Sequence, residues 1–392
     1  MRRSGIVWFG LFTLLLSGCR GVDSLVTEQS AKTNSGFALV VSTHERCGSC
    51  FQNSELFAFD LTKPQKPRRM SSAKLQDAAG KQFLSFEMDV DAEGNLFAGG
   101  GYPDNPNEPF LASHQALLFF PASSSSWFSS LSATDLKVYG MAVDGPSRRV
   151  IVTNWDGLTI LHYDSTLGEI VAVRGPLLPL PDWGIWGEHL TVAPDGERLF
   201  LLNHDLYQIT MGDDDSLGPI KRLSSMGLQA YSEQVTFDAY HSRWIVNTIV
   251  APTDTRFIHG ELRLVSGDSS DYVTLYAADR NSNSVLEGQL IQRGERYVAL
   301  EHGFRGDQPT CFLHVFALRN AGTAHLQSGG FACNSVPMAL DPSGRFAYVG
   351  LKEGLATFNV ESAEDLAEPP LLVPWPDETE REIFAMTVVP HR

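Results

Sequence analysis

The stretch VPMALDPSGRFAYVG, residues 336–350, decides the fold. Two apolar runs flank Asp341-Pro342-Ser343-Gly344, a sequence typical of tight turns, so the stretch predicts two antiparallel β-strands joined by a hairpin. Similar stretches recur about every 50 residues, a spacing that fits a four-stranded unit such as a propeller blade. The copies are FEMDVDAEGNLFAGG from Phe86, YGMAVDGPSRRVIVTN from Tyr139, EHLTVAPDGERLFLLN from Glu188, EQVTFDAYHSRWIVN from Glu233 and a degenerate EGQLIQRGERYVAL from Glu287.

The two ends of the repeat region complement each other. IFAMTVVP, from Ile383, has only the first strand of the repeat, and GFALVVST, residues 36–43, supplies the missing second strand. We therefore predict an all-β, seven-bladed β-propeller over residues 36–392, closed by pairing of the N- and C-terminal strands. The seven equivalent positions are Met88, Met141, Leu190, Val235, Gly288, Met338 and Met386.

Two of these copies resemble known repeats. VIVTN, residues 150–154, resembles the YVTN-type repeat of bacterial propellers, with Ile151 in place of the tyrosine. DPSGRFAYVG, residues 341–350, resembles the repeat of seven-bladed lactonases. The resemblance covers most of residues 37–390 and implies the fold far more than an activity.

The N-terminus predicts export and lipidation. Arg2 and Arg3 precede an apolar run, residues 5–16, that is too short to span a bilayer and is typical of a secretory signal. Leu16-Ser17-Gly18-Cys19 resembles the lipobox of bacterial lipoproteins, which implies lipidation of Cys19. In that family an Asp after the cysteine retains proteins in the inner membrane, and here Arg20 follows. We therefore expect the outer membrane of a diderm bacterium; the alternative is an ordinary cleaved signal with an incidental cysteine.

The chain divides into three parts on this interpretation. Residues 1–18 are a lipoprotein signal peptide, residues 19–35 are the lipidated cysteine with a flexible tether, and residues 36–392 are the propeller. The formal net charge of -16 argues against nucleic acid as a partner. We expect the N-terminal lipid to contact the membrane and the propeller to be monomeric.

The face at which the innermost strands begin, the top face, should carry the longer loops. We expect loops at residues 42–55, 100–114, 251–260 and 302–310, and long blade linkers at 175–188 and 374–382. Aromatic loop residues suit the recognition of a protein or glycan, although they could instead plug the channel or pack on one another. The predicted binding face comprises Tyr102, Trp183, Trp186, Phe257, Phe304 and Trp375.

Four cysteines remain when Cys19 is lipidated, and export favours disulfides. Cys311 and Cys333 should both reach the top end of one blade, so we expect them to be paired. Cys47 and Cys50 form CGSC, which we interpret as a loop-stapling disulfide. A redox or metal role is the alternative, although neither a helix start nor a second CxxC accompanies the motif.

Four glutamates near the starts of innermost strands are the candidate metal ligands: Glu87, Glu188, Glu233 and Glu287. Calcium takes six to eight oxygen ligands, and the arrangement resembles that of calcium-dependent propeller lactonases and phosphotriesterases. Asn154, Asn203 and Asn247 would join the shell, although asparagine at a strand end is also ordinary turn chemistry. The glutamates stand one or two residues before their equivalent positions, so alternation along a strand points the two pairs in different directions.

Other polar residues offer weaker signals. His189, His204 and His302 could supply a general base, but no GxSxG is present, so we expect solvated or hydrogen-bonding roles. GDDDS, residues 212–216, lacks the spacing and terminal Glu of an EF-hand and predicts a solvated hairpin on the opposite, bottom face.

These features predict a membrane-anchored protein of the cell envelope that binds or scaffolds a protein or glycan, without a cofactor. The alternative is a calcium-assisted hydrolase of lactones or esters, with Glu188 and Glu233 as its first ligands. A third class is structural adhesion without a discrete ligand.

Overall fold

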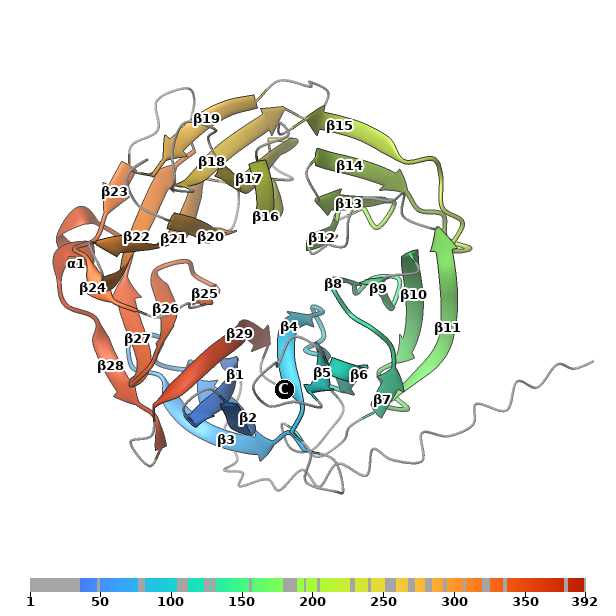
Figure 1. Cartoon of the computed structure of the whole chain (residues 1–392), viewed down its shortest axis with the longest axis horizontal. Helices are drawn as coiled ribbons and strands as arrows, with labels where there is room; N and C mark the ends of the chain where they lie inside the picture. The colour runs from blue at the N-terminus through green and yellow to red at the C-terminus, as the bar shows by residue number, and fades with distance from the viewer. Residues whose placement is uncertain are drawn as a thin grey trace, which may run out of the picture.

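Seven antiparallel sheets surround a central axis (Figure 1), which confirms the seven-bladed propeller. The computed structural model describes residues 36–47, 50–76, 82–103, 112–122, 128, 132–154, 157–178, 189–193, 195–202, 205–225, 230–238, 241–250, 259–266, 272–278, 284–291, 295–305, 308–318, 325–333, 337–376 and 380–390. Within these ranges no helix is long and apolar enough to cross a membrane.

The blades are numbered along the chain, and the strands of each blade are named from the innermost outward. They are, in blade 1, β29 (Arg381–Pro390), β1 (Phe37–Cys47), β2 (Cys50–Asp60) and β3 (Arg68–Lys74); in blade 2, β4 (Leu84–Val90), β5 (Leu96–Pro103), β6 (Ala112–Phe120) and β7 (Ser132–Asp135); in blade 3, β8 (Gly140–Asp144), β9 (Arg149–Asn154), β10 (Gly157–Asp164) and β11 (Glu169–Leu178); in blade 4, β12 (His189–Val192), β13 (Arg198–Leu202), β14 (Asp205–Thr210) and β15 (Lys221–Ser225); in blade 5, β16 (Ala230–Asp238), β17 (Arg243–Val250), β18 (His259–Ser266) and β19 (Tyr272–Ala277); in blade 6, β20 (Ser284–Leu290), β21 (Arg296–Arg305), β22 (Gln308–Ala317) and β23 (His325–Gln327), with β24 (Phe331–Ala332) also on β22; and in blade 7, β25 (Met338–Leu340), β26 (Phe346–Leu351), β27 (Gly354–Asn359) and β28 (Leu371–Pro374), with helix α1 (Ala363–Ala367) before β28.

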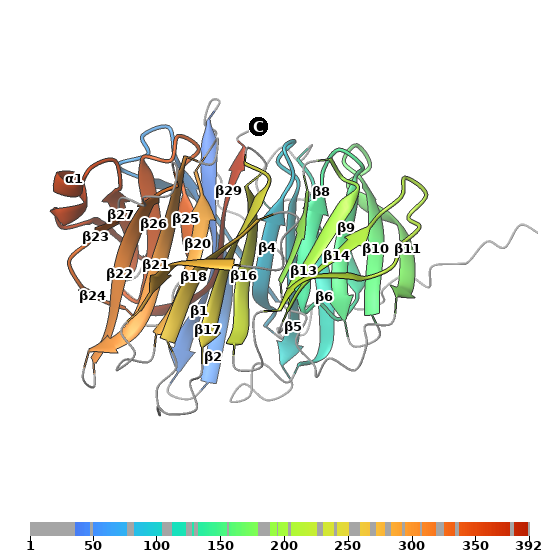
Figure 2. The ribbon, with the colours of Figure 1, turned by 90° about the horizontal axis from the view of Figure 1, so that it is seen from above.

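Blade 1 is built from both ends of the described chain. β29 pairs antiparallel with β1, so that Val41 lies opposite Met386 and Phe37 lies opposite Pro390. The predicted closure is therefore confirmed. Figure 2 shows the ring from the side, with α1 and the end of β29 at its upper edge, so that edge is the bottom face and the lower edge is the top face.

The equivalent positions inferred from the repeat all lie on innermost strands. Met88 pairs with Ala98, and Met338 pairs with Val349. Gly288 explains why its copy of the repeat is degenerate. A Cβ at Gly288 would lie 2.6 Å from the carbonyl oxygen of Val298, so only glycine fits this close approach.

The core consists of apolar seams between neighbouring blades. On β1, Ala38 and Val40 pack with residues of blade 2, whereas Leu39 and Val41 pack with residues of blade 7. The strand is therefore buried on both faces, which accounts for its nearly unbroken apolar sequence. Each large side chain buried in such a seam stabilises the fold by about 1.5–3 kcal/mol.

Polar contacts join successive blades at the bottom face. Arg149 donates to Asp144 Oδ2 at 2.7 Å and to the carbonyl oxygen of Gly212 in blade 4 at 2.9 Å. Asp215 lies in the GDDDS turn, is 5% exposed, and accepts from His162 Nε2 at 2.7 Å. The prediction that this turn is solvated is wrong for Asp215, because blade 3 covers it and supplies its partners.

Two of the predicted top-face loops are strands. β1 continues to Cys47 and β2 begins at Cys50, so CGSC is the end of a hairpin and not part of a long loop. In the same way, β21 continues to Arg305 and β22 begins at Gln308, so this range is also the end of a hairpin. Thr43 and His44, which lie in the first of these ranges, are fully buried, and their backbones pair with β29 as β1 continues.

Candidate functional site

A buried arginine lies where the top ends of blades 7 and 1 meet. Arg381 Nη2 lies 3.1 Å from Glu45 Oε1, and its Nη1 lies 3.1 Å from Glu55 Oε2. The guanidinium also lies over the ring of Phe57, 4.9 Å from its centroid. Because two carboxylates and an aromatic face surround one cation, this group holds the start of β29 against β1 and β2.

His44 lies next to this arginine in the seam between blades 1 and 2. Its ring is fully buried, and Nδ1 lies 2.8 Å from the hydroxyl of Ser54. Burial, followed by the positive charge of Arg381, lowers the pKa of His44 to about 3. His44 is therefore neutral near pH 7 and serves as a hydrogen-bonding core residue.

Side chains of three innermost strands reach across to the next blade. Asp89 Oδ2 accepts from Val143 N at 2.9 Å, and Gln234 Oε1 accepts from Gly288 N at 2.8 Å. Gln289 Oε1 accepts from Leu340 N at 3.1 Å. These contacts satisfy backbone groups at the channel edge of each sheet. Burial raises the pKa of Asp89 to about 6, with a smaller contribution from Asp91, against the lowering effect of the hydrogen bonds from Val90 and Val143.

The four candidate calcium ligands are only partly described. Glu87 is half-buried on β4, and Glu287 is exposed on β20. Glu188 and the side chain of Glu233 lie outside the described residues. In the described part of the chain, no three side chains of His, Cys, Asp or Glu form a group that could hold a metal ion. A calcium site built on these glutamates stays a prediction.

The asparagines that would join such a shell have structural partners. Asn154 Nδ2 donates to Thr159 Oγ1 at 3.1 Å. Asn247 is fully buried between blades 5 and 6, where its Nδ2 lies 3.0 Å from Gln234 Oε1 and from the hydroxyl of Tyr297. Its predicted place at the end of the strand is wrong, because β17 continues to Val250. Asn203 lies outside the described residues.

One predicted member of the aromatic binding face belongs to the core. Trp375 is 2% exposed, packs against Phe57 and Phe59, and donates from Nε1 to the carbonyl oxygen of Leu351 at 2.9 Å. Its assignment to the binding face is wrong, because the chain after β28 turns inward to the seam between blades 7 and 1.

The other predicted binding-face residues are not tested. Trp183, Trp186 and Phe257 lie outside the described residues, as do the side chains of Tyr102 and Phe304. Their role in binding stays a prediction.

The top-side histidines have lowered pKa values where they are described. Burial lowers the pKa of His189 to about 4 and lowers the pKa of His302 as well. A group with a pKa near 4 is poorly matched to general-base catalysis at neutral pH. His204 lies outside the described residues.

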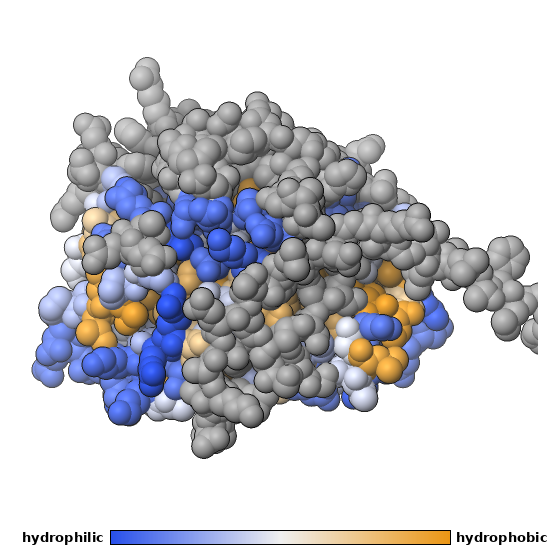
Figure 3. All heavy atoms as spheres, turned by 90° about the horizontal axis from the view of Figure 1, so that it is seen from below, coloured by the Kyte–Doolittle hydropathy of each residue, from blue (hydrophilic) through white to orange (hydrophobic). Residues whose placement is uncertain are grey.

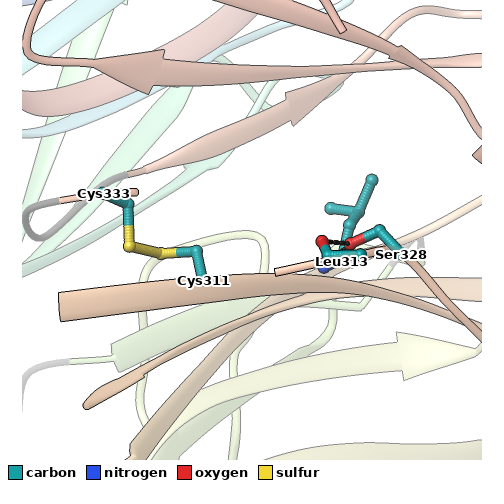
Figure 4. Close-up of a disulfide and its surroundings, with 5 residues drawn as sticks. Cys311, Leu313, Ser328 and Cys333 are labelled. Atoms are coloured by element: carbon teal, nitrogen blue, oxygen red, sulfur yellow. Dashed lines mark hydrogen bonds between the residues drawn. A yellow bond between two sulfur atoms is a disulfide. The ribbon is translucent and has the colours of Figure 1, made fainter. Parts of the chain in front are cut away.

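The Cys311–Cys333 disulfide is present (Figure 4), with a Cα–Cα distance of 5.8 Å. Beside it, the Ser328 hydroxyl accepts from Leu313 N at 2.9 Å, so two contacts hold residues 328–333 against β22. The backbones of Cys47 and Cys50 lie opposite each other at the end of their hairpin, but their side chains lie outside the described residues. Their disulfide stays a prediction.

A charged group on β18 was not foreseen from the sequence. Glu261 Oε1 lies 3.2 Å from His259 Nε2, and its Oε2 lies 2.9 Å from Arg263 Nη2. The guanidinium of Arg263 covers the ring of Tyr272 at 4.3 Å. The signal was present, because HGELRLVS alternates polar and apolar residues and so places His259, Glu261 and Arg263 on one face of a strand.

A second unforeseen group joins blades 5 and 6. Glu301 Oε2 accepts from the hydroxyl of Tyr276 on β19 at 2.6 Å and from His314 Nε2 on β22 at 2.9 Å. His314 Nδ1 in turn lies 2.8 Å from Nε2 of His325 on β23, and His325 is exposed. A hydrogen-bonded path therefore leads from a buried carboxylate to the rim. The spacing of these residues in sequence carries no signal, since the sheet brings them together.

The rim also presents apolar side chains on outermost strands. Val171 and Val173 on β11 are about half exposed, and Leu371 and Leu372 on β28 are slightly less so. Figure 3 shows one side of the ring, on which the apolar areas of the described surface are separated by hydrophilic ones. The described surface in this view therefore has no single continuous apolar area.

The chain is a seven-bladed β-propeller with distant structural similarity to lactonase-like propellers. No protein-family model and no curated protein matches it. A Bacteroides fragilis protein, provisionally described as a 6-phosphogluconolactonase, aligns with a TM-score of 0.55 at 12% identity, over 92% of this chain and 100% of its own. Hydrazine synthase of Kuenenia stuttgartiensis aligns with a TM-score of 0.50 at 12% identity, over 72% of this chain and 81% of its own. The Dos1 propeller aligns with a TM-score of 0.50 at 9% identity, over 76% of this chain and 74% of its own. At these identities the similarity shows the fold alone.

Proposed function

We propose that the protein is a lipid-anchored propeller of the bacterial cell envelope that binds a protein or glycan partner through its top face. One observation carries the proposal: Phe37 lies opposite Pro390, at the end of β29 and therefore at the bottom face. A tether that ends at Gly36 leaves the ring from that face. The top face then points away from the membrane to which Cys19 would be anchored.

The geometry of the tether supports this orientation. Residues 20–35, if flexible, would hold the ring roughly 20–25 Å from the lipid. At that distance the bottom face lies close to the bilayer, and a large partner has access mainly to the opposite face. The polar groups described near the channel also favour the binding role over the hydrolase. Asp89, Gln234 and Asn247 make structural contacts within and between blades, so we assign them to the scaffold and place the binding function in the loops of the top face.

The anchor is tested first, by mass spectrometry of the protein extracted from membranes. The expected N-terminus is an acylated Cys19, and Cys19→Ser should yield a protein that partitions into the aqueous phase. An unmodified N-terminus at any other residue would contradict the lipoprotein assignment. It would leave the fold untouched and would remove the orientation argument for the top face, so that the cross-linking experiment alone would test binding there.

The binding face is tested by photo-cross-linking in intact envelopes. A photoreactive amino acid at position 183 or 186 should give a discrete adduct, and the same probe at position 372, on the exposed outer strand β28, should not. Equal labelling from the top-face positions and from position 372, or none from the top face of a folded protein, would overturn the proposal.

The calcium-assisted hydrolase is the alternative, and elemental analysis separates it from the binding role. The purified propeller is loaded with calcium and dialysed, beside a Glu188→Gln, Glu233→Gln variant. One retained calcium ion per chain that the variant loses would favour the hydrolase and justify screens with lactones and esters.

A further inference from the structure

We propose that His314 and His325 form a proton-sharing latch that fastens the outer edge of blade 6 and releases it in acid. The proposal goes beyond the proposed function, because it concerns the rim and not the top face. It is independent of the identity of any partner.

The hydrogen bonds assign the protons of the pair. The carboxylate of Glu301 can only accept, so His314 donates to it from Nε2 and, as a neutral imidazole, keeps a lone pair on Nδ1. His325 therefore donates from Nε2 to His314 Nδ1 across 2.8 Å. One proton joins the two rings.

The ring geometry fits a proton better than a metal ion. The rings are 17° from coplanar with centroids 5.1 Å apart, and that separation is the one expected for two imidazoles meeting end to end in one plane. The two nitrogens then point straight at each other. A metal bound by both would need the two lone pairs to converge from one side on a point about 2.0–2.1 Å from each nitrogen, which the end-to-end arrangement of the rings does not allow.

Proton counting gives the response to acid. The first added proton can reside on Nδ1 of His325, and the bridge survives because His325 still donates and His314 still accepts. A second proton makes both rings imidazolium, so that two N–H groups face each other and the bridge must open. The second protonation requires a lower pH than the first, because it places like charges in contact.

Ionisable side chains face the pair from several elements in the part of the chain that the structure describes. Tyr276 faces it from β19, and Glu301 faces it from β21 and stabilises positive charge on the pair. Burial lowers the pKa of His325, and His314 lowers it further, whereas Glu301 raises it. On the other face of β23, α1 brings Glu364 and Asp365, while Leu326 packs in the same apolar cluster as Leu366.

The backbone pairing of β23 is short, so side-chain contacts add to it. The His325 ring stacks on Phe316 with centroids 4.7 Å apart, Leu326 packs in the cluster of Leu366, and the latch adds the bridge to His314. β23 pairs with β22 at three positions only, from His314 with Gln327 to Phe316 with His325. Beyond β23, the Leu313–Ser328 hydrogen bonds and the Cys311–Cys333 disulfide hold the segment independently of the histidines. Acid should therefore loosen residues 325–327 and leave residues 328–333 in place.

Hydrogen exchange followed by mass spectrometry, with rates corrected for intrinsic exchange, tests the latch in the full-length protein. Protection of the β23 amides should be similar at pH 7.5 and 6.0 and should fall roughly two- to tenfold at pH 4.5, as expected for the loss of one hydrogen bond. The amide of Ser328 should keep its protection. Near-UV circular dichroism at each pH confirms that the ring is folded.

The matched variant is His325→Gln. A glutamine amide can turn its N–H or its oxygen toward His314, so it bridges in either protonation state and should abolish the fall at pH 4.5. His241→Gln removes a histidine that pairs with Asp238 in blade 5, and should leave the fall unchanged. Equal β23 protection at all three pH values, or the same fall in His325→Gln, would overturn the proposal.

Discussion

Arg381 Nη1 donates to the hydroxyl of Thr43 at 3.3 Å, although the two residues lie 338 positions apart in the sequence. The contact belongs to the ion group that holds the last strand of the propeller against the first. Arg381→Met should lower the free energy of unfolding by about 3 kcal/mol or more, because it leaves the carboxylates of Glu45 and Glu55 without their buried cation. Urea unfolding at pH 7 measures the change.

Lys352→Met is the control for that experiment. Lys352 pairs with Glu380 in the same region, but both side chains are well exposed. Exposed pairs contribute about 0–1 kcal/mol, so this variant should unfold close to the wild type. Similar losses in both variants would mean that the burial of Arg381 is not what matters.

His44 should make the protein less stable as the pH falls. Its pKa of about 3 in the fold lies below its ordinary value of 6.5, so between these values the unfolded chain binds one more proton than the folded chain. The free energy of unfolding then falls by about 1.4 kcal/mol for each pH unit. His44→Gln should reduce the measured slope between pH 6.5 and 4.5 by this amount. The same slope in His44→Gln as in the wild type would contradict this prediction.

Asp89 should act with the opposite sign. Its pKa of about 6 lies above the ordinary value of 3.8, so between these values the folded chain binds the extra proton and its stability rises as the pH falls. Asp89→Asn should lose that gain, and the stability difference between wild type and variant should widen in favour of the wild type from pH 6.5 to 4.5. A stability difference that stays constant from pH 6.5 to 4.5 would contradict this prediction.

Loss of the Cys311–Cys333 disulfide should cost about 3 kcal/mol, the value expected for closing a loop of this length. The pair is separated by 22 positions. A Cys311→Ala, Cys333→Ala double variant, unfolded in urea beside the oxidised wild type, gives the difference without a reducing agent. A difference below 1 kcal/mol would show that β22 and the Ser328 contacts hold this segment without the bond.

The fold could be predicted from the sequence because each blade repeats the same local pattern. The Asp-Pro-Ser-Gly turn at residues 341–344 and the half-copies at the two ends were enough to count blades and to pair β29 with β1. The disulfide between Cys311 and Cys333 could be predicted because both residues were placed at the top end of one blade. In each case the signal lay in short-range spacing.

The side-chain groups between blades could not be predicted in this way. Trp375 lies in a linker that looked exposed, but the position of blade 1 decides that it is buried. His325 meets His314 across a sheet, and Tyr276 reaches Glu301 from a different blade. Asp215 finds its partners in blade 3, not in its own hairpin. Such contacts depend on which faces of neighbouring sheets meet.

The pairing of β29 with β1 has a consequence for synthesis. A ribosome completes β1 near the beginning of the chain and β29 near its end, so the inner edge of β1 stays unpaired until Arg381–Pro390 has been made. A chain that stops short of Arg381 would keep an open strand edge that invites aggregation and proteolysis. The sheet of blade 1 can therefore close only in a chain that includes the last strand, and we expect quality control to remove truncated copies before they accumulate.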